Sequence, residues 1–273
     1  MAKIRLDVLM VQRALTETRE KAKRLIMAGL VFSNHERMDK PGIKVSPDIP
    51  LTVKGKDIPY VGRGGLKLET ALATFDIDIR QKVMVDVGSS TGGFTDCALQ
   101  NGVKMSYAID VGYNQLAWSL RQDDRVVVME RTNFRHVTPE MFGECRPNFA
   151  TIDVSFISLR LILPVLKQIL ESSSDVVALI KPQFEAGKDQ VGKKGIVKDK
   201  HIHVEVLERI IQFAIQEGYQ FNDLTFSQIT GGSGNIEFLA HFRWQQNTET
   251  KAINQDQIKE IVDQAHRYFH KQG

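Results

Sequence analysis

Residues Asp86–Phe94 have the clearest potential for chemistry, because they form a glycine-rich loop that reads DVGSSTGGF. An apolar stretch with strand character precedes the loop, and a helical pattern follows it. Gly88, Gly92 and Gly93 carry no Cβ, so the backbone can come close to a ligand. The loop lacks both the GxGxxG pattern of dinucleotide sites and the GK[ST] ending of a P-loop. It therefore predicts a nucleotide-like ligand of another kind.

Two carboxylates narrow the identity of this ligand. Asp86 at the start of the loop suits the cationic methionine end of S-adenosylmethionine better than a pyrophosphate. Asp110 ends the next apolar stretch in YAIDVGYNQLAW, where it could accept hydrogen bonds from ribose hydroxyls or cap the chain. Asn133, in ERTN after a further strand, could bind the base or simply turn the chain. The predicted cofactor contacts are Asp86, Gly88, Ser89, Ser90, Gly92, Gly93, Phe94, Asp110 and Asn133.

Four charged residues stand where an α/β core exposes its active edge. Asp153 ends the strand-like stretch in ATIDVSFISL, and Lys181 ends the one in ALIKPQFE. Glu237 lies in the glycine-rich run TGGSGNIEFLAHF, and Lys67 in GRGGLKLE falls off the apolar stripe of its helix. Ligands of open α/β sheets bind at the carboxyl ends of the strands. We therefore take these four residues as candidates for a catalytic group.

The elements that position these residues alternate between strand and helix. Such alternation indicates an α/β fold with a mostly parallel sheet covered by helices on both faces. The last two strands could pair as an antiparallel edge. The expected strands are 83–87, 105–109, 126–129, 149–154, 176–180, 224–228 and 236–243.

The first 60 residues read as a separate basic module of two helices and a small sheet. They hold 12 Lys/Arg against 7 Asp/Glu, a net charge of +5, whereas the whole chain carries only +3. A basic module favours an anionic partner, although a solvated surface is an equal reading of charge alone. The candidate phosphate-binding residues are Arg5, Arg13, Arg19, Lys21, Lys23 and Arg24.

Two further segments leave their roles open. Residues 187–200, GKDQVGKKGIVKDK, follow Lys181 and could form a lid that orders on an anionic partner or a disordered surface loop. Residues 258–269 carry an apolar helical stripe that predicts a helix docked on the body of the protein, with a homodimer contact as the alternative.

Composition excludes several classes of protein. The two cysteines have neither CxxC nor metal-ligand spacing, so disulfides and structural zinc are not expected and a reducing compartment is favoured. The N-terminus is interrupted by charges and lacks the apolar core of a signal peptide. No stretch approaches the length of a membrane span. We expect a cytoplasmic protein that has no metal site and binds neither a membrane nor DNA.

Taken together, the motifs resemble the TlyA family, also called hemolysin A-like. The shared motifs are GRGGLKLE, DVGSSTGGF, IDVSFISL, LIKPQFE and GNIEF, together with IRLDVLMVQRAL, TREKAKRLIMAGLV and DKPG near the N-terminus. The resemblance implies a Rossmann-like methyltransferase fold of the FtsJ type, preceded by the αL RNA-binding motif of ribosomal small-subunit protein four. It suggests an RNA-binding domain at 1–57, a linker at 58–65, a catalytic domain at 66–245 and a helical tail at 246–273.

The resemblance also implies roles for the four charged residues. Lys67, Asp153, Lys181 and Glu237 would form a Lys–Asp–Lys–Glu tetrad that transfers a methyl group from S-adenosylmethionine to a ribose 2′-oxygen, of cytidine in ribosomal RNA. Lys181 would accept or direct the hydroxyl proton, Asp153 would orient Lys181, and Lys67 and Glu237 would hold the ribose. The alternatives are a non-catalytic assembly factor, a small-molecule methyltransferase and a toxin.

Overall fold

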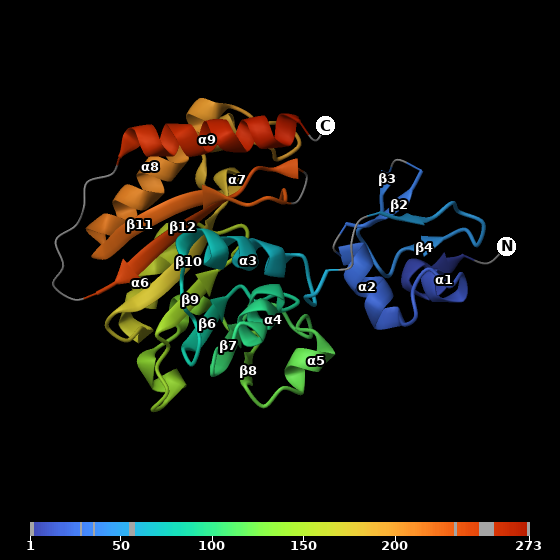
Figure 1. Ribbon diagram of the computed structural model, residues 1–273, viewed down its shortest axis with the longest axis horizontal. Helices are drawn as coiled ribbons and strands as arrows, with labels where there is room; N and C mark the ends of the chain where they lie inside the picture. Colours follow the sequence, from blue (N-terminus) through green and yellow to red (C-terminus); the bar gives the residue numbers. More distant parts are fainter. Residues whose placement is uncertain are drawn as a thin grey trace. The chain divides into compact units, whose positions relative to one another are not determined.

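The computed structural model describes residues 3–27, 29–34, 36–54, 58–231, 234–245 and 254–271. The chain divides into two compact units, Met1–Gly65 and Leu66–Gly273. Figure 1 shows their elements coloured along the sequence. Within the described residues, no helix is long and apolar enough to cross a membrane.

The first unit contains two helices and short strands, as the sequence predicts. Its elements are β1 (Ile4–Arg5), α1 (Leu6–Gln12), α2 (Arg19–Met27), β2 (Val31–Ser33), β3 (Glu36–Arg37), β4 (Lys44–Val45) and β5 (Thr52–Val53). The strands form a β1–β4 pair and a β3–β2–β5 sheet. The apolar faces of α1 and α2 meet in a small core that includes Leu6, Met10 and Ile26, all fully buried. Gly29 follows α2 with a φ of +72°, a left-handed conformation that ends helices.

The second unit is built on a seven-stranded sheet. Its strands are β6 (Val83–Val87), β7 (Met105–Ile109), β8 (Val126–Met129), β9 (Phe149–Ile152), β10 (Ser174–Ile180), β11 (Tyr219–Phe226) and β12 (Phe238–Trp244). Their order is β11–β12–β10–β9–β6–β7–β8. β12 is antiparallel to both of its neighbours, whereas the other pairs are parallel. This confirms the predicted mostly parallel sheet with an antiparallel edge.

Helices cover both faces of this sheet. The helices are α3 (Gly64–Phe75), α4 (Gly93–Gln100), α5 (Trp118–Arg121), α6 (Leu163–Ile169), α7 (Pro182–Glu185), α8 (Lys200–Gln216) and α9 (Gln255–His270), with short 3₁₀ turns η1 (Phe134–His136), η2 (Pro139–Phe142), η3 (Leu159–Leu161) and η4 (Lys188–Gln190). The main core joins α6, α8 and α9 to one face of the sheet, and α3 and α4 lie on the other face (Figure 1).

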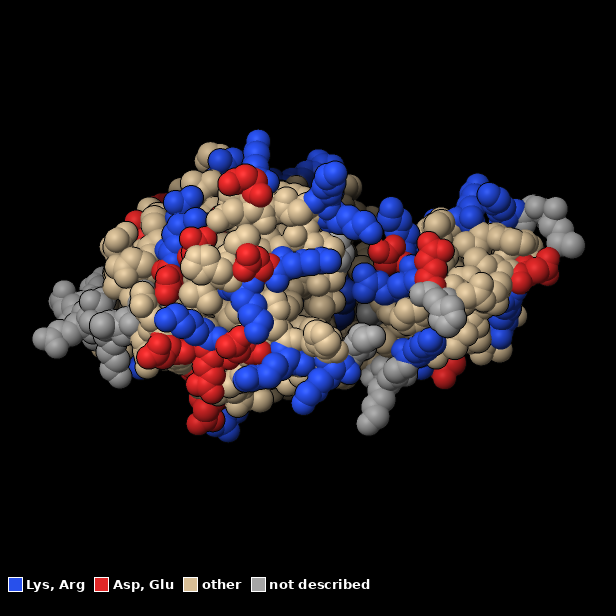
Figure 2. All heavy atoms as spheres, turned by 90° about the horizontal axis from the view of Figure 1, so that it is seen from above, with Lys and Arg blue, Asp and Glu red and all other residues tan. Residues whose placement is uncertain are grey.

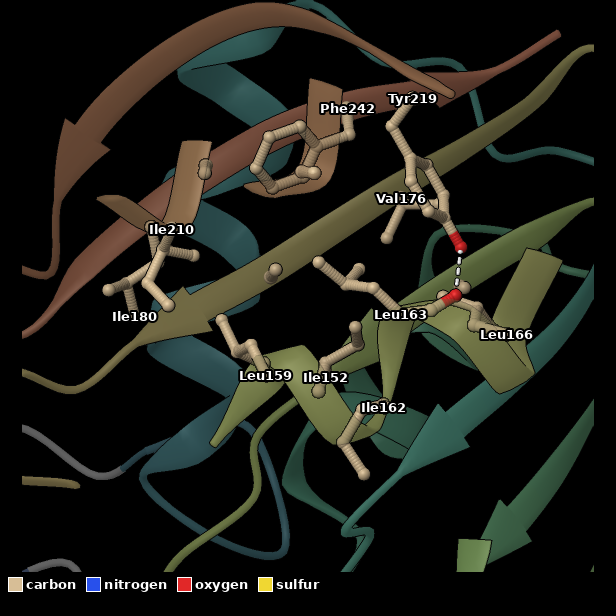
Figure 3. Packing of buried hydrophobic residues seen from close by; sticks show 14 of the residues in the cluster. Ile152, Leu159, Ile162, Leu163, Leu166, Val176, Ile180, Ile210, Tyr219 and Phe242 are labelled. Atoms are coloured by element: carbon tan, nitrogen blue, oxygen red, sulfur yellow. Dashed lines mark hydrogen bonds between the residues drawn. The ribbon is translucent and has the colours of Figure 1, made fainter. Parts of the chain in front are cut away.

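The core beneath α6 and α8 holds this sheet together (Figure 3). Tyr219 of β11 is fully buried there, and its hydroxyl donates to the backbone oxygen of Leu163 at 2.8 Å. A buried tyrosine needs such a partner for its hydroxyl. This bond connects the edge strand β11 to helix α6.

The C-terminal helix α9 docks on the same body. Its residues Ile258, Val262 and Ala265 are buried in the main core, and the helix packs on α8 and β11. The docked helix predicted from the apolar stripe is confirmed. The same chain covers the stripe that a homodimer would have used, so nothing in this packing supports the dimer alternative.

Candidate active site

The sheet topology brings Lys67, Asp153, Lys181 and Glu237 to one edge. Asp153 and Lys181 directly follow the parallel neighbours β9 and β10. Because β12 is antiparallel to β10 and pairs Phe238 with Ile180, Glu237 stands at the level of Lys181. Lys67 reaches the group from the first turn of α3. The four residues therefore lie at one edge of the sheet, as the sequence predicts. Glu237 reaches this edge because its strand, β12, runs antiparallel to β10.

The four side chains form a row of alternating charges, in the order Glu237, Lys67, Asp153 and Lys181. Lys67 Nζ donates to Glu237 Oε2 at 2.6 Å and lies 3.7 Å from Asp153 Oδ2. Lys181 Nζ lies 2.5 Å from Asp153 Oδ1 and donates to Ser155 Oγ at 3.0 Å. Lys67, Lys181 and Glu237 are each less than a tenth exposed. The formal charges balance, which is the condition for keeping such groups out of water.

The lysines decide the charge of Asp153. Burial alone would raise the pKa of its carboxyl, but the neighbouring Lys67 and Lys181 hold the pKa of Asp153 below its usual range. The other carboxylate, Glu237, is fixed through both oxygens, because Gln183 Nε2 donates to Oε1 at 3.3 Å while Lys67 holds Oε2. The two lysines therefore favour the ionised form of Asp153.

An exposed aromatic ring stands beside this group and was not predicted. Phe156, three residues after Asp153, is 89% exposed and has a φ of +62°. Its ring contacts that of Phe184 at 4.8 Å between centroids. Glu185 fixes the following turn by accepting from Ser158 Oγ at 2.7 Å, and burial raises the pKa of Glu185. The signal in the sequence is the large apolar residue amid the polar turn DVSFIS.

The glycine-rich loop passes directly over the backbone of Asp153. Gly88 has a φ of +83°, and a Cβ at this position would lie 2.6 Å from the Asp153 carbonyl oxygen. Gly92, with a φ of +93°, precedes α4, and a Cβ there would overlap the Leu120 side chain at 2.2 Å. Only glycine satisfies both the conformation and the space at these two positions.

Asp86 lies beneath this loop rather than in it. The residue is fully buried, and its carboxylate accepts from Thr95 N at 3.1 Å, Thr95 Oγ1 at 2.7 Å and Thr151 Oγ1 at 2.9 Å. Burial raises the pKa of Asp86 to about 6. The carboxylate therefore has no surface to offer a cofactor, contrary to the expected direct contact, and it instead joins the start of α4 to β9.

The other loop residues divide between buried and open positions. Gly93 and Phe94 open α4 and are buried, and Ser89 is 6% exposed. Ser90 is exposed, and its N–H donates to Asp110 Oδ2 at 2.8 Å. Asp110 Oδ1 accepts from Gly112 N at 2.7 Å, so each oxygen keeps a lone pair for a further donor.

A glutamate that the sequence did not predict as a site residue, Glu130, holds the segment after Asp110 in place. Glu130 accepts from Asn114 N and Gln115 N and pairs with Arg121, whose hydrogen bond lowers the pKa of Glu130 to about 2. Within this segment, the side chain of Val111, next to Asp110, is 71% exposed. Asn133 Oδ1 accepts from Arg135 N at 3.2 Å as the cap of η1, which matches the turning role rather than base binding.

The candidate RNA-binding residues of the first unit have unequal environments. Arg5 and Arg19 remain about half exposed while both bind the buried Asp7, whose pKa is lowered to about 2 by these arginines against the effect of burial. Arg13 is used internally, because it donates to the carbonyls of Pro47 and Ile49. Lys23 pairs with Glu20 at 2.7 Å, Lys21 lies on α2, and Arg24 buries its Nε.

Comparison with family models assigns both units. Residues 60–244 match the FtsJ-like methyltransferase model, and residues 4–48 match the S4 domain model. The first match covers most of the second unit and includes all four charged residues.

Relatives match over nearly the whole chain. A Bacillus subtilis protein named "Putative rRNA methyltransferase YqxC" is 62% identical over 97% of this chain and 95% of its own. A Mycobacterium tuberculosis protein named 16S/23S rRNA (cytidine-2′-O)-methyltransferase TlyA is 39% identical over 96% of each chain. A solved structure, "Putative hemolysin from Streptococcus thermophilus", is 53% identical and covers 100% of this chain and 98% of its own, with a TM-score of 0.80.

Proposed function

The chain belongs to the FtsJ-like methyltransferase family, and on that premise we propose that it methylates the 2′-hydroxyl of a cytidine ribose in ribosomal RNA, with S-adenosylmethionine as the donor. The observation that carries the proposal is the buried, charge-balanced group of Lys67, Asp153, Lys181 and Glu237 under the glycine-rich loop. The named activities of the relatives agree with it.

The residues around the loop fit an adenosyl-methionine group. The Gly88 backbone leaves a cradle that a Cβ could not share with Asp153. Asp110 would accept hydrogen bonds from ribose hydroxyls through its remaining lone pairs. The exposed Val111 would pack against the face of the adenine ring. Ser89, Ser90, Gly92, Gly93 and Phe94 would shape the cradle, with Asp86 supporting it from below and Asn133 turning the chain at its rim. The bound group would supply a methyl group on a sulfonium sulfur, and this sulfur is a good leaving group because it departs as a neutral thioether.

The chain's own task is then to position the ribose and remove one proton. A 2′-hydroxyl is a weak nucleophile while protonated. Lys181 Nζ would accept that proton after releasing one of its own to solvent, and Asp153 at 2.5 Å would stabilise the ammonium that forms. Lys67 and Glu237 would hold the ribose, because their mutual hydrogen bond fixes the orientation of both groups.

The acceptor nucleotide also needs a surface for its base. Phe156 offers an exposed ring three residues from Asp153, and nucleobases stack on such rings whatever their identity. Arg5 and Arg19 of the first unit, which Asp7 holds in place, would bind RNA phosphates, with Lys21, Lys23 and Arg24 on the same helix. Arg13 would stabilise the unit instead. The proposed site of action is the cytoplasm.

The test uses labelled S-adenosylmethionine with separated ribosomal subunits and with naked ribosomal RNA, followed by mapping of the modified nucleotide. We expect 2′-O-methylcytidine in one of them. Failure of transfer to every acceptor would favour an RNA-binding assembly factor without activity.

A variant at Lys181 tests the catalytic assignment. We expect Lys181→Ala to abolish transfer while binding of S-adenosylhomocysteine, measured by calorimetry, is retained. Lys104→Ala is the matched control, because Lys104 is exposed just before β7, at the opposite edge of the sheet. Full transfer by Lys181→Ala would show that this amine does not handle the proton.

A further inference from the structure

Residues 187–200, which we call the basic loop, concentrate positive charge within a mixed surface. The loop contains five lysines and two aspartates in fourteen residues. Figure 2 shows a face of the molecule on which acidic and basic side chains are interspersed. The sequence left its role open between a lid and a disordered segment.

The described contacts give the basic loop a fixed conformation. Val197 is 2% exposed, its N–H donates to Asn235 Oδ1 at 3.1 Å, and its carbonyl is 3.1 Å from His203 Nε2. Asn235 Nδ2 also donates to the carbonyl of Gly195 at 2.9 Å. The buried side chain of Asn235 thus holds the loop backbone at two positions, Gly195 and Val197. Little conformational entropy of the loop therefore remains to be lost when it binds a ligand.

The anchor of the basic loop is next to the catalytic group. Asn235 precedes Glu237 by two residues, a separation of at most about 7 Å between Cα atoms. At its other end, the loop begins six residues after Lys181, across the short helix α7. The lysines of the loop are therefore held at a set distance from the place where the ribose would react.

Three of these lysines face a common cavity and have no acidic partner among the residues that the structure describes. Lys193, Lys194 and Lys198 line a cavity of about 400 Å³, and none of them forms an ion pair with another described residue. Lys200 differs, because it pairs with Asp263 at 2.5 Å. Asp199, which also lines the cavity, is committed to capping α8 by accepting from His201 N at 2.8 Å.

We propose that the basic loop binds backbone phosphates of the RNA beside the acceptor ribose. The proposal rests on the proposed function and adds an RNA contact within the methyltransferase unit itself. Lysines supply phosphate affinity without reading sequence, and a loop fixed to Asn235 needs no reorganisation to present them. Its effect would be to hold the nucleotides next to the reacting cytidine.

The test is a triple variant, Lys193→Gln/Lys194→Gln/Lys198→Gln, in the full-length protein. Filter binding of labelled ribosomal RNA fragments is measured as a function of KCl concentration. Each phosphate contact contributes about 0.7 to the slope of log affinity against log salt for single strands, so the loss of three contacts lowers the slope by about 2. We expect the KM for RNA to rise while kcat and S-adenosylhomocysteine affinity are unchanged.

A control variant, Lys104→Gln/Lys259→Gln/Lys271→Gln, removes the same charge from exposed positions outside the loop. It should keep the wild-type slope. Equal slopes for the two triple variants would overturn the basic-loop proposal. That result is distinct from failure of the proposed function, which would appear as absent methyl transfer by the wild type whatever the slopes.

Discussion

Replacing Lys67 by methionine should cost more stability than any other single change in the charged group. Lys67 is the cation that contacts Glu237, and the two side chains are 6% and 3% exposed. Methionine preserves the stem but leaves the buried Glu237 carboxylate with only Gln183 as a described side-chain partner. Breaking one partner of a buried pair typically costs about 3–5 kcal/mol.

The structure also predicts an asymmetry between the two partners. Glu237→Gln leaves Lys67 with Asp153 at 3.7 Å and retains an oxygen for Gln183, so it should cost less than Lys67→Met. The double variant Lys67→Met/Glu237→Gln removes both charges and should regain most of the loss. The coupling energy from this double-mutant cycle should be roughly 2 kcal/mol or more.

Urea unfolding followed by tryptophan fluorescence provides the assay. The chain has two tryptophans, Trp118 and Trp244, and both lie in the second unit, so the signal reports that unit. A loss of 3–5 kcal/mol corresponds to a midpoint lower by roughly 1–2 M urea. If Lys67→Met unfolded within about 0.3 M of the wild type, the buried ion pair would be refuted.

Three further changes test the loop and the acceptor side. Burial gives Asp86 a pKa of about 6 in the folded protein, against an ordinary value of 3.8, so the folded state binds a proton more tightly. The contribution of the Asp86 carboxylate to stability is unfavourable above pH 6 and is relieved as the pH falls toward 4. Relative to Asp86→Asn, the wild type should therefore gain about 1 kcal/mol of unfolding free energy between pH 8 and pH 5 in urea titrations, and a difference that is constant with pH would contradict the raised pKa. Gly88→Ala should weaken S-adenosylhomocysteine binding in calorimetry by tenfold or more, because the new Cβ would meet Asp153 at 2.6 Å, whereas Gly143→Ala, with positive φ but open space, should bind normally. Phe156→Ala should lower methyl transfer to RNA by about tenfold, the equivalent of one lost stacking contact, without moving the urea midpoint, because the ring is 89% exposed; unchanged transfer would remove Phe156 from the acceptor site.

Periodicity predicted most of the fold because the strands are short, apolar and separated by helices. The predicted bounds of β6, β7 and β8 coincide with those in the structure. Strands β10 and β11 begin earlier than expected, at Ser174 and Tyr219, because polar residues near their starts break the apolar run.

The candidate site was predictable where a residue type and a strand end coincide. Asp153 and Lys181 stand directly after apolar strands, and their meeting follows from parallel pairing. The direction in which Asp86 points could not be read from the sequence, because alternate strand residues face opposite sides and the partner Thr151 comes from another strand.

The roles of individual arginines in the first unit were harder to predict from the sequence than the positions of the strands. Arg13 and Arg19 look alike on the helical pattern, yet Arg13 binds the carbonyls of Pro47 and Ile49 while Arg19 stays half exposed beside Asp7. The difference depends on contacts over more than thirty residues in the first case. Such distant partners leave no local signal in the sequence.

The position of β12 between β10 and β11 also determines when the protein can become active during its synthesis. Lys67 and Glu237, which form one hydrogen bond, are 170 residues apart, and β11 emerges before β12, the only strand of the described sheet that pairs with it. Until residue 244 has left the ribosome, β10 remains an open sheet edge, which is a template for misassembly. A nascent chain that stops before β12 should therefore be both aggregation-prone and inactive. On the proposed function, the protein could act on ribosomal RNA only after β12 has been translated and has paired with β10.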